Sequence, residues 1–164
     1  MNPCPCGYYN HPEMNCSCGP GIVQKYLARI SGPLLDRIDI QIEVVPVPFK
    51  ELTDLSRSES SESIRNRVIE ARKIQEERFK DLKGIYCNAQ MTPKLMRQHC
   101  IIDDAGNTLL KTAMEKLSLS ARAYDRILKV SRTVADLEAS PTIRLEHLAE
   151  AINYRSLDKA GWGG

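Results

Sequence analysis

The sequence has few aromatic residues and lacks the loop that cradles phosphates in many nucleotide-binding proteins. Aromatics make up 5% of the 164 residues, so Leu, Ile, Val and Ala must fill any core, which favours helical packing. None of the nine glycines lies in a G-x-x-x-x-G-K-[ST] pattern. No apolar strand runs into an acidic pair that could hold Mg²⁺. The chain alone is therefore not expected to hold phosphates or their metal.

Long apolar runs and strong net charge are also missing. No stretch approaches the ~18 apolar residues of a membrane span, and the N-terminus lacks the basic and apolar regions of a signal peptide. The 23 basic and 21 acidic residues give a net charge of +2, too small to indicate nucleic-acid binding by itself. We expect a cytoplasmic protein without membrane contact, in which the six cysteines are not assumed to form disulfides.

Hydrophobic spacing predicts a mainly α-helical fold. A short helix is expected over residues 22–29, ended by Ser31-Gly32-Pro33. Apolar residues then recur at helical spacing from about residue 62 to residue 83, and the rest of the bundle follows up to residue 156. Three polar residues are placed to cap helices in this region, namely Thr92, Asp103 and Ser120. The pattern predicts a bundle of four or five helices.

One segment predicts a β-strand. Residues 38–44 alternate apolar and polar side chains, which is typical of a strand with one buried face, and Pro46 and Pro48 would end it. A single strand cannot form a sheet. We therefore expect its neighbours to come from outside this chain or from another copy of it.

Four cysteines lie within fifteen residues, as Cys4-x-Cys6 and Cys16-x-Cys18. Two such pairs on facing turns could bind one tetrahedral Zn²⁺, and His11 could replace one thiol. Four protein ligands leave no open position, so the role would be structural. The alternative is a set of free thiols in a loop, or a loop ordered only within a larger protein.

Other candidate residues favour ordinary structural roles. The basic residues of the helix from residue 62, Arg78 among them, are interleaved with acidic ones, as on a solvated helix face. This segment therefore offers no independent sign of a groove for nucleic acid. His99 and His147 stand on helices without acidic or thiol partners at ligand spacing, and we expect surface or capping positions for both.

Several motifs resemble one known family when they are taken together and in order. These are Met-Asn-Pro-Cys-Pro-Cys-Gly at residues 1–7, Arg-Ile-Ser-Gly-Pro-Leu-Leu-Asp-Arg-Ile-Asp at residues 29–39, and Ser-Ala-Arg-Ala-Tyr-Asp-Arg-Ile at residues 120–127. Over nearly its whole length the chain resembles the YifB/ComM-like group of magnesium-chelatase-related AAA+ ATPases. The resemblance implies that it is the C-terminal part of such an ATPase.

The resemblance also implies an organisation of the chain. Residues 1–55 would be the last part of the α/β AAA+ core with a Cys-rich loop. Residues 56–61 would be a linker, residues 62–157 the helical lid and residues 158–164 a flexible tail. The partners would be the N-terminal AAA+ core and the neighbouring subunits of a hexameric ring, with DNA as the substrate of the ComM-like motors.

Three residues match functional positions of the family. Asn2 matches sensor 1, which orients the attacking water or contacts the γ-phosphate. Arg37 matches the arginine finger, which reaches the γ-phosphate bound by the neighbouring subunit. Arg122 matches sensor 2, a lid arginine that contacts the nucleotide of its own subunit. ATP and Mg²⁺ would be held by the parent protein, and the chain alone would not hydrolyse ATP.

Simpler interpretations exist for each of these residues and for the whole chain. Asn-Pro is a common turn, Arg37 could pair with a neighbouring aspartate, and Arg122 could belong to a basic solvated stripe. The whole chain could instead be the I subunit of magnesium chelatase, which drives metal insertion into a porphyrin. It could also be a zinc-containing knob joined to a helical adaptor module.

Overall fold

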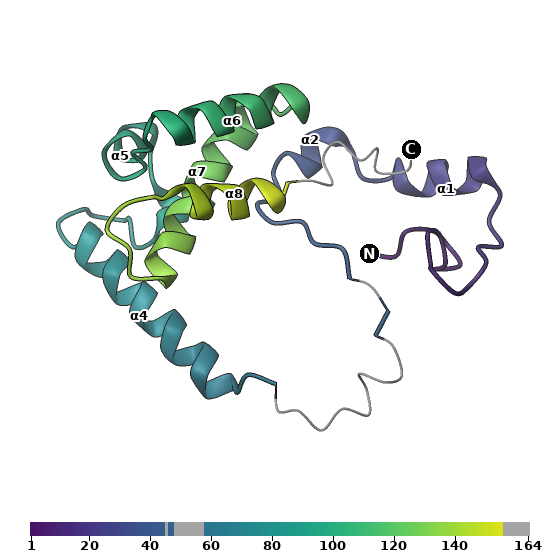
Figure 1. Cartoon of the computed structure of the whole chain (residues 1–164), viewed down its shortest axis with the longest axis horizontal. Coiled ribbons are helices and arrows are strands. Elements are labelled where there is room, and N and C mark those ends of the chain that lie inside the picture. The colour runs from purple at the N-terminus through teal and green to yellow at the C-terminus, as the bar shows by residue number, and fades with distance from the viewer. Residues whose placement is uncertain (45, 48–57, 156–164) are drawn as a thin grey trace.

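The structure is a computed structural model that describes residues 1–44, 46–47 and 58–155. It is mainly helical, as predicted, and no strand is formed among these residues. The elements are α1 (Pro20–Leu27), α2 (Gly32–Leu35), α4 (Ser61–Phe79), the short 3-10 helix η1 (Asn88–Gln90), α5 (Pro93–His99), α6 (Asp104–Lys116), α7 (Ala121–Leu137) and α8 (Leu145–Asn153). Figure 1 shows α4–α8 gathered in one lobe, with α1 and the N-terminus in another and α2 between them.

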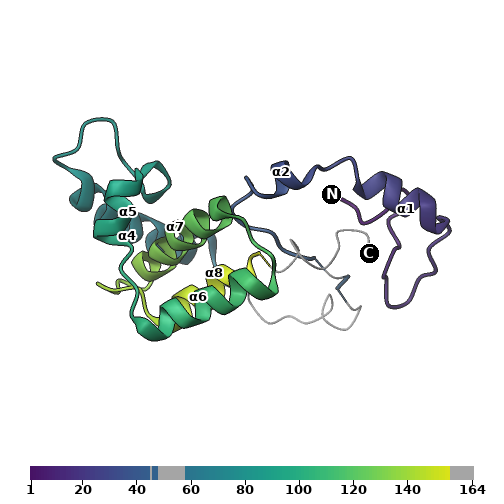
Figure 2. The ribbon, with the colours of Figure 1, turned by 90° about the horizontal axis from the view of Figure 1, so that it is seen from above.

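Helix α7 lies at the centre of the helical lobe. It packs against α8, α4, α5 and η1, while α6 packs against α8 (Figure 2). Its inner face carries Ala123, Ile127, Leu128 and Ala135, all of them buried. The buried core around it consists of Leu, Ile, Ala, Met and Cys side chains together with Phe79, in agreement with the shortage of aromatic residues.

The three predicted capping residues begin helices at the expected places. The side chains of Thr92, Asp103 and Ser120 each accept a hydrogen bond from the backbone N–H three residues further on, at the starts of α5, α6 and α7. Such caps satisfy amide groups that have no partner inside the helix. The predicted linker is partly helical, because Ser60 caps α4 and Ser61 is already its first residue.

A buried ion network crosses the helical lobe and was not predicted. Both carboxylate oxygens of Asp136 accept hydrogen bonds from Arg78, at 2.7 and 2.5 Å, and Asp136 also accepts from Arg132 Nε at 3.1 Å. Asn88 Nδ2 donates to Asp136 at 2.7 Å. The Asp136 side chain is fully buried and that of Arg78 is only 13% exposed. Arg78 is therefore not part of a solvated helix face.

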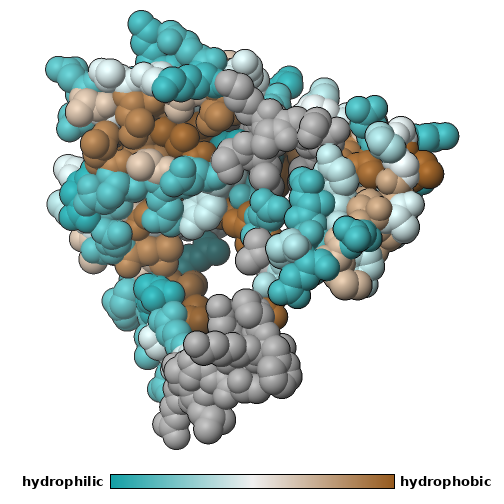
Figure 3. Space-filling view, turned by 45° about the vertical axis from the view of Figure 1, so that its right-hand side comes forward, coloured by the Kyte–Doolittle hydropathy of each residue, from teal (hydrophilic) through white to brown (hydrophobic). Residues whose placement is uncertain are grey.

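The N-terminal lobe has a small core of its own. Cys4, Val23 and Leu27 are buried together, with Tyr9, Tyr26 and the other clustered cysteines packed around them. Both lobes show apolar surface in the space-filling view (Figure 3). Helix α2 begins at the Gly32-Pro33 pair, which the sequence analysis took only as the end of α1.

The predicted strand at residues 38–44 is not formed, and this corrects the strand part of the fold prediction. The segment is extended, but its apolar side chains are exposed: Ile38 by 37%, Ile40 by 51%, Ile42 by 66% and Val44 by 83%. A strand needs a neighbouring strand, and the described residues contain none; the Gln41 N–H donates instead to the Tyr154 carbonyl, just after α8. Pro48, the predicted tail at residues 158–164 and part of the predicted linker lie outside the described residues.

No helix in the described part of the chain has the length and apolar character needed to cross a membrane.

Candidate functional site

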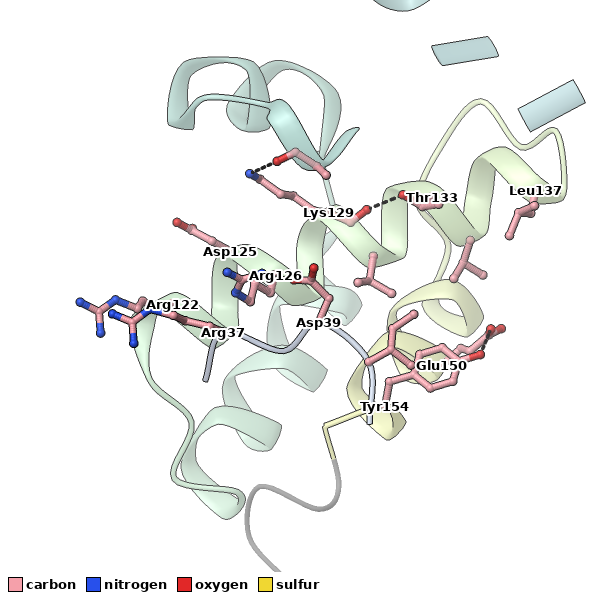
Figure 4. Close-up of a pocket in the computed structure, with 14 residues that line it drawn as sticks. Arg37, Asp39, Arg122, Asp125, Arg126, Lys129, Thr133, Leu137, Glu150 and Tyr154 are labelled. Atoms are coloured by element: carbon pink, nitrogen blue, oxygen red, sulfur yellow. Dashed lines mark hydrogen bonds and ion pairs between the residues drawn. The ribbon is translucent and has the colours of Figure 1, made fainter. Parts of the chain in front are cut away.

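An open groove of about 610 Å³ lies where residues 36–41 meet helices α7 and α8 (Figure 4). We call residues 36–41 the docking segment. The groove contains both arginines that the sequence analysis singled out, Arg37 and Arg122. Its other lining residues are Asp39, Ile40, Ala89, Asp125, Arg126, Lys129, Val130, Thr133, Val134, Leu137, Glu150 and Tyr154.

Arg37 and Arg122 lie at the same end of the groove. Figure 4 shows their guanidinium groups extending in the same direction, away from the inner part of the groove. Both residues are exposed. Arg37 Nη1 donates to the Pro33 carbonyl at 2.8 Å. Within the described residues, Arg122 makes no hydrogen bond or ion pair, and no carboxylate lies within ion-pair distance of either guanidinium group.

The inner part of the groove is more nearly neutral. Arg126 forms an ion pair with Asp39, and Lys129 Nζ donates to the Ala89 carbonyl at 2.8 Å. The Tyr154 hydroxyl donates to Glu150 at 2.8 Å, and this hydrogen bond raises the pKa of Tyr154. The two groove arginines without an ion-pair partner among the described residues therefore lie at the outer end, and Asp125 also lines the groove.

Two adjacent guanidinium groups without an acidic partner suit an anion with several oxygens. Each guanidinium is planar and permanently charged, and it can bind phosphate or carboxylate oxygens in pairs. The resemblance predicts that Arg37 reaches the nucleotide bound by the neighbouring subunit and that Arg122 contacts the nucleotide of its own subunit. Here both arginines of one chain face the same space.

The four N-terminal cysteines converge, although they come from two separate turns. All four Sγ atoms lie within 4.8 Å of one another. Cys4 Sγ is 3.3 Å from Cys6 Sγ and 3.7 Å from Cys16 Sγ, and the Cys6–Cys16 separation is 3.5 Å. A tetrahedral Zn²⁺ with Zn–S bonds of about 2.3 Å holds its sulfurs about 3.8 Å apart. The cluster therefore fits a zinc ion.

The pKa values of these thiols are displaced in opposite directions. Hydrogen bonds with the Tyr8 backbone and then with the Cys4 thiol lower the pKa of Cys6 to about 5. For Cys16, a hydrogen bond with the Cys18 backbone lowers the pKa, but desolvation and hydrogen bonds with neighbouring thiols raise it to about 12. One thiolate forms easily in this group and makes the next ionisation harder, which is the electrostatic situation that a bound cation relieves.

The backbone around the cluster is shaped by a tight turn. Gly7 adopts φ +86° and its N–H donates to the Cys4 carbonyl at 3.1 Å. His11 lies outside the cluster, and its Nδ1 accepts hydrogen bonds from the N–H groups of Glu13 and Met14. Asn2 is exposed beside Gly7 and does not line the groove that holds Arg37 and Arg122.

A second group of titratable residues surrounds the start of α8. The fully buried His147 accepts the Arg144 N–H at Nδ1, 3.0 Å away, so its Nε2 donates to Glu138 at 3.0 Å. Arg144 also forms ion pairs with Glu138 and Glu146. His147 is thus a capping residue, as predicted, but it is buried and has an acidic partner that its sequence surroundings did not reveal.

Sequence reasoning also missed two arginines that hold the docking segment. Arg126 pairs with Asp39 across 87 residues of sequence, and the buried Arg155 donates to the Ile38 carbonyl across 117. Separations of this size leave no periodic signal in the sequence.

Comparison with protein families places both parts of the chain in one group. Residues 58–155 match the model described as magnesium chelatase, subunit ChlI C-terminal. Residues 1–52 match the model described as magnesium chelatase, subunit ChlI.

Individual relatives agree with these matches. Competence protein ComM of Haemophilus influenzae is 42% identical over 96% of this chain and 30% of its own length. The uncharacterized protein YifB of Salmonella typhimurium is 37% identical over 97% of this chain and 30% of its own. An uncharacterized protein of Mycobacterium tuberculosis is 30% identical over 94% of this chain. The chain spans about 30% of the length of these relatives, and it belongs to the magnesium chelatase ChlI family.

Proposed function

We propose that this chain supplies Arg37 and Arg122 to an ATP site in a ring-forming AAA+ ATPase of the YifB/ComM type. The observation that carries the proposal is the pair of guanidinium groups at one end of the groove, neither of which has an ion-pair partner among the described residues. Arg37 would act as the arginine finger on the γ-phosphate. Arg122 would act beside it on the same polyphosphate.

The charge distribution supports this assignment. The developing charge of a transferring phosphoryl group is spread over several oxygens, and fixed arginines stabilise it without having to reorganise. The remaining groove cations, Arg126 and Lys129, are already engaged with Asp39 and a backbone carbonyl. Asn2 lies outside the groove. We therefore rest the proposal on the two arginines and keep sensor 1 as a separate prediction for Asn2.

The resemblance to these relatives supports the proposed substrate and assembly. ComM of Haemophilus influenzae is named as a competence protein, and the resemblance to ComM-like motors makes DNA the proposed substrate of the parent ring. ATP and Mg²⁺ would be held by the phosphate-binding core of that ring, which this chain would complete.

A chimaera tests the arginine proposal. The segment of Haemophilus influenzae ComM that matches this chain would be replaced by residues 1–164, and ATP hydrolysis would be measured with and without DNA. We expect hydrolysis by the chimaera and none by the chain alone. In the chimaera, Arg37→Ala should lower kcat by roughly 10³–10⁵, the usual contribution of an arginine finger. Arg122→Ala should also lower it.

The matched control is Arg97→Ala, which removes an exposed arginine of α5 outside the groove. It should leave hydrolysis unchanged. Full activity of both Arg37→Ala and Arg122→Ala in an active chimaera would contradict the proposal.

We also propose that Cys4, Cys6, Cys16 and Cys18 bind one structural Zn²⁺. The support is the convergence of four sulfurs at near-tetrahedral spacing in a chain region with a very small core. Bound zinc would fix the two turns relative to α1, because unfolded turns of this length have few other contacts to order them.

Metal analysis of the purified chain tests this site. We expect one zinc per chain and its loss in Cys16→Ser, whereas Cys87→Ser, outside the cluster, should retain it. A chelator should speed amide hydrogen exchange in residues 1–27 and leave residues 58–155 unaffected. If the purified chain contained no zinc, and a chelator changed the amide exchange rates of no region, a structural zinc would be contradicted.

A further inference from the structure

The docking segment is held by the helical lobe on both sides of Arg37. Before Arg37, Asp36 lies 4.0 Å from Arg155 Nη2. After it, the Ile38 carbonyl accepts from Arg155 Nη1, and Asp39 pairs with Arg126. The Gln41 N–H then donates to the Tyr154 carbonyl at 2.9 Å. Arg37 is the residue of this stretch whose charged group is directed to the outer end of the groove.

The contact made by Arg155 is buried. Its side chain has no exposed surface, and a guanidinium is stable in such a place only when hydrogen bonds and opposite charge replace its water. Arg155 donates to the Ile38 carbonyl and lies 4.0 Å from Asp36, and both of these residues are in the docking segment. The position of Arg155 after α8 is therefore coupled to the position of the backbone next to Arg37.

The contact made by Arg126 links the same segment to the helix that carries Arg122. Residues four apart on a helix lie on one face, so Arg126 lies one turn further along α7 than Arg122. Its pairing with Asp39 is partly solvent-exposed, with side-chain exposures of 31% and 52%. By holding Asp39, Arg126 keeps the residue two positions after Arg37 against α7.

We propose that Arg126 and Arg155 are positioning residues that clamp the docking segment to the helical lobe and so hold Arg37 beside Arg122. This inference rests on the proposed function in one respect, namely that the paired guanidinium groups act on a polyphosphate. The helical lobe would then carry Arg37, the proposed arginine finger, with it. Movement of the helical lobe towards or away from a nucleotide would bring or withdraw both arginines together.

Hydrogen exchange on the chain itself tests the clamp without any nucleotide. The readout is the exchange rate of the Gln41 amide, which is protected by its bond to Tyr154. Asp39→Lys and Arg126→Glu should each raise this rate several-fold through like-charge repulsion, and the double variant should restore it by re-forming the pair with reversed signs. Arg155→Met should raise the rate roughly tenfold or more, since it removes a charged hydrogen-bond donor.

Arg97→Glu is the matched control for the exchange experiment. It makes the same charge change at an exposed position of α5 outside the groove, so the Gln41 rate should not change. If neither single variant alters the Gln41 rate, or if the double variant does not restore it, the clamp is overturned. Circular dichroism of each variant checks that the helical lobe remains folded.

Hydrolysis by the ComM chimaera then tests the positioning role. Arg126→Glu should lower kcat with little change in the KM for ATP, and Asp39→Lys with Arg126→Glu should recover most of kcat. An undiminished kcat in Arg126→Glu, in a chimaera that Arg37→Ala inactivates, would overturn positioning while the phosphate proposal stands. If Arg37→Ala left the kcat of the chimaera unchanged, the proposed function would be overturned instead. The Gln41 exchange rates would still test whether Arg126 and Arg155 hold the docking segment.

Discussion

The two lobes of the molecule are stabilised in different ways. The helical lobe, residues 58–155, has a continuous aliphatic core and a buried network in which Asp136 is bonded by Arg78, Arg132 and Asn88. The N-terminal lobe has three buried apolar residues, Cys4, Val23 and Leu27, and a cluster of four thiols. Its extended part, residues 38–44, exposes its apolar side chains.

This difference separates a unit that can fold by itself from one that depends on other partners. Burial of aliphatic side chains around α7 and fully bonded buried charges suffice for the helical lobe. A core of three residues does not suffice, so we expect the N-terminal lobe to rely on a metal ion and on contacts with the rest of an ATPase. The docking segment, which belongs to the N-terminal part of the chain, contacts the helical lobe.

The largest expected effect comes from removing the centre of the buried network. Asp136→Ala leaves Arg78 and Arg132 without their carboxylate, and breaking a buried pair in this way costs about 3–5 kcal/mol. We expect a decrease of this size in the free energy of unfolding, measured by urea titration of the signal at 222 nm. Asp125→Ala, at an exposed position of the same helix, should change it little.

Equivalent truncations in the two cores provide a second comparison. Leu148→Ala removes a fully buried side chain of the helical lobe and should cost about 2–5 kcal/mol. Val23→Ala should affect hydrogen exchange only in residues 1–27, since its core is separate. If Val23→Ala lowered the unfolding free energy of residues 58–155 as much as Leu148→Ala does, the two lobes would be one cooperative unit.

The third prediction concerns alkaline pH. Burial raises the pKa of Cys100 in the helical core to about 11, above its value in an unfolded chain. The folded state therefore keeps a proton that the unfolded state loses, and the resulting stability is complete below about pH 9 and is lost as pH rises towards 11. The wild-type chain should lose roughly 2–3 kcal/mol more than Cys100→Ala over this interval. If the unfolding free energies of the wild-type chain and Cys100→Ala fell in parallel from pH 9 to pH 11, the prediction would be contradicted.

The smallest effect is expected at a helix cap. Ser120 accepts a hydrogen bond from the Ala123 N–H at 3.3 Å at the start of α7. Ser120→Ala should lower the unfolding free energy of the helical lobe by about 1 kcal/mol, whereas Ser120→Asp keeps an acceptor and should be nearly neutral. An equal loss in both variants would show that the hydroxyl acts in some other way.

The helical lobe could be predicted largely from local sequence. Thr92, Asp103 and Ser120 marked three helix starts because their side-chain oxygens act within three residues. Helix α2 was missed although the signal was present, since Pro33 is suited to the first turn of a helix as well as to the end of the preceding one. The alternation at residues 38–44 predicted a strand that is not formed, because strand formation depends on a neighbouring strand.

The candidate site could be predicted only in part. The motifs identified Arg37, Arg122 and the four cysteines, and the structure adds that the two arginines share a groove and that the sulfurs converge. Arg126 and Arg155 were not predicted, because their partners lie about a hundred residues away. The buried bond between Arg78 and Asp136 was hidden for the same reason, within a helix whose other charges are solvated.

The exposed apolar residues of the extended segment affect how the chain behaves when it is produced alone. Ile38, Ile40, Ile42 and Val44 form a stretch of exposed apolar side chains that alternates with polar ones and belongs to no sheet among the described residues, and such a stretch is a template for pairing between molecules. We expect concentration-dependent aggregation, which light scattering would detect. Ile42→Lys, at a position that makes none of the contacts of the docking segment, should improve the solubility of the chain and leave its helical lobe unchanged.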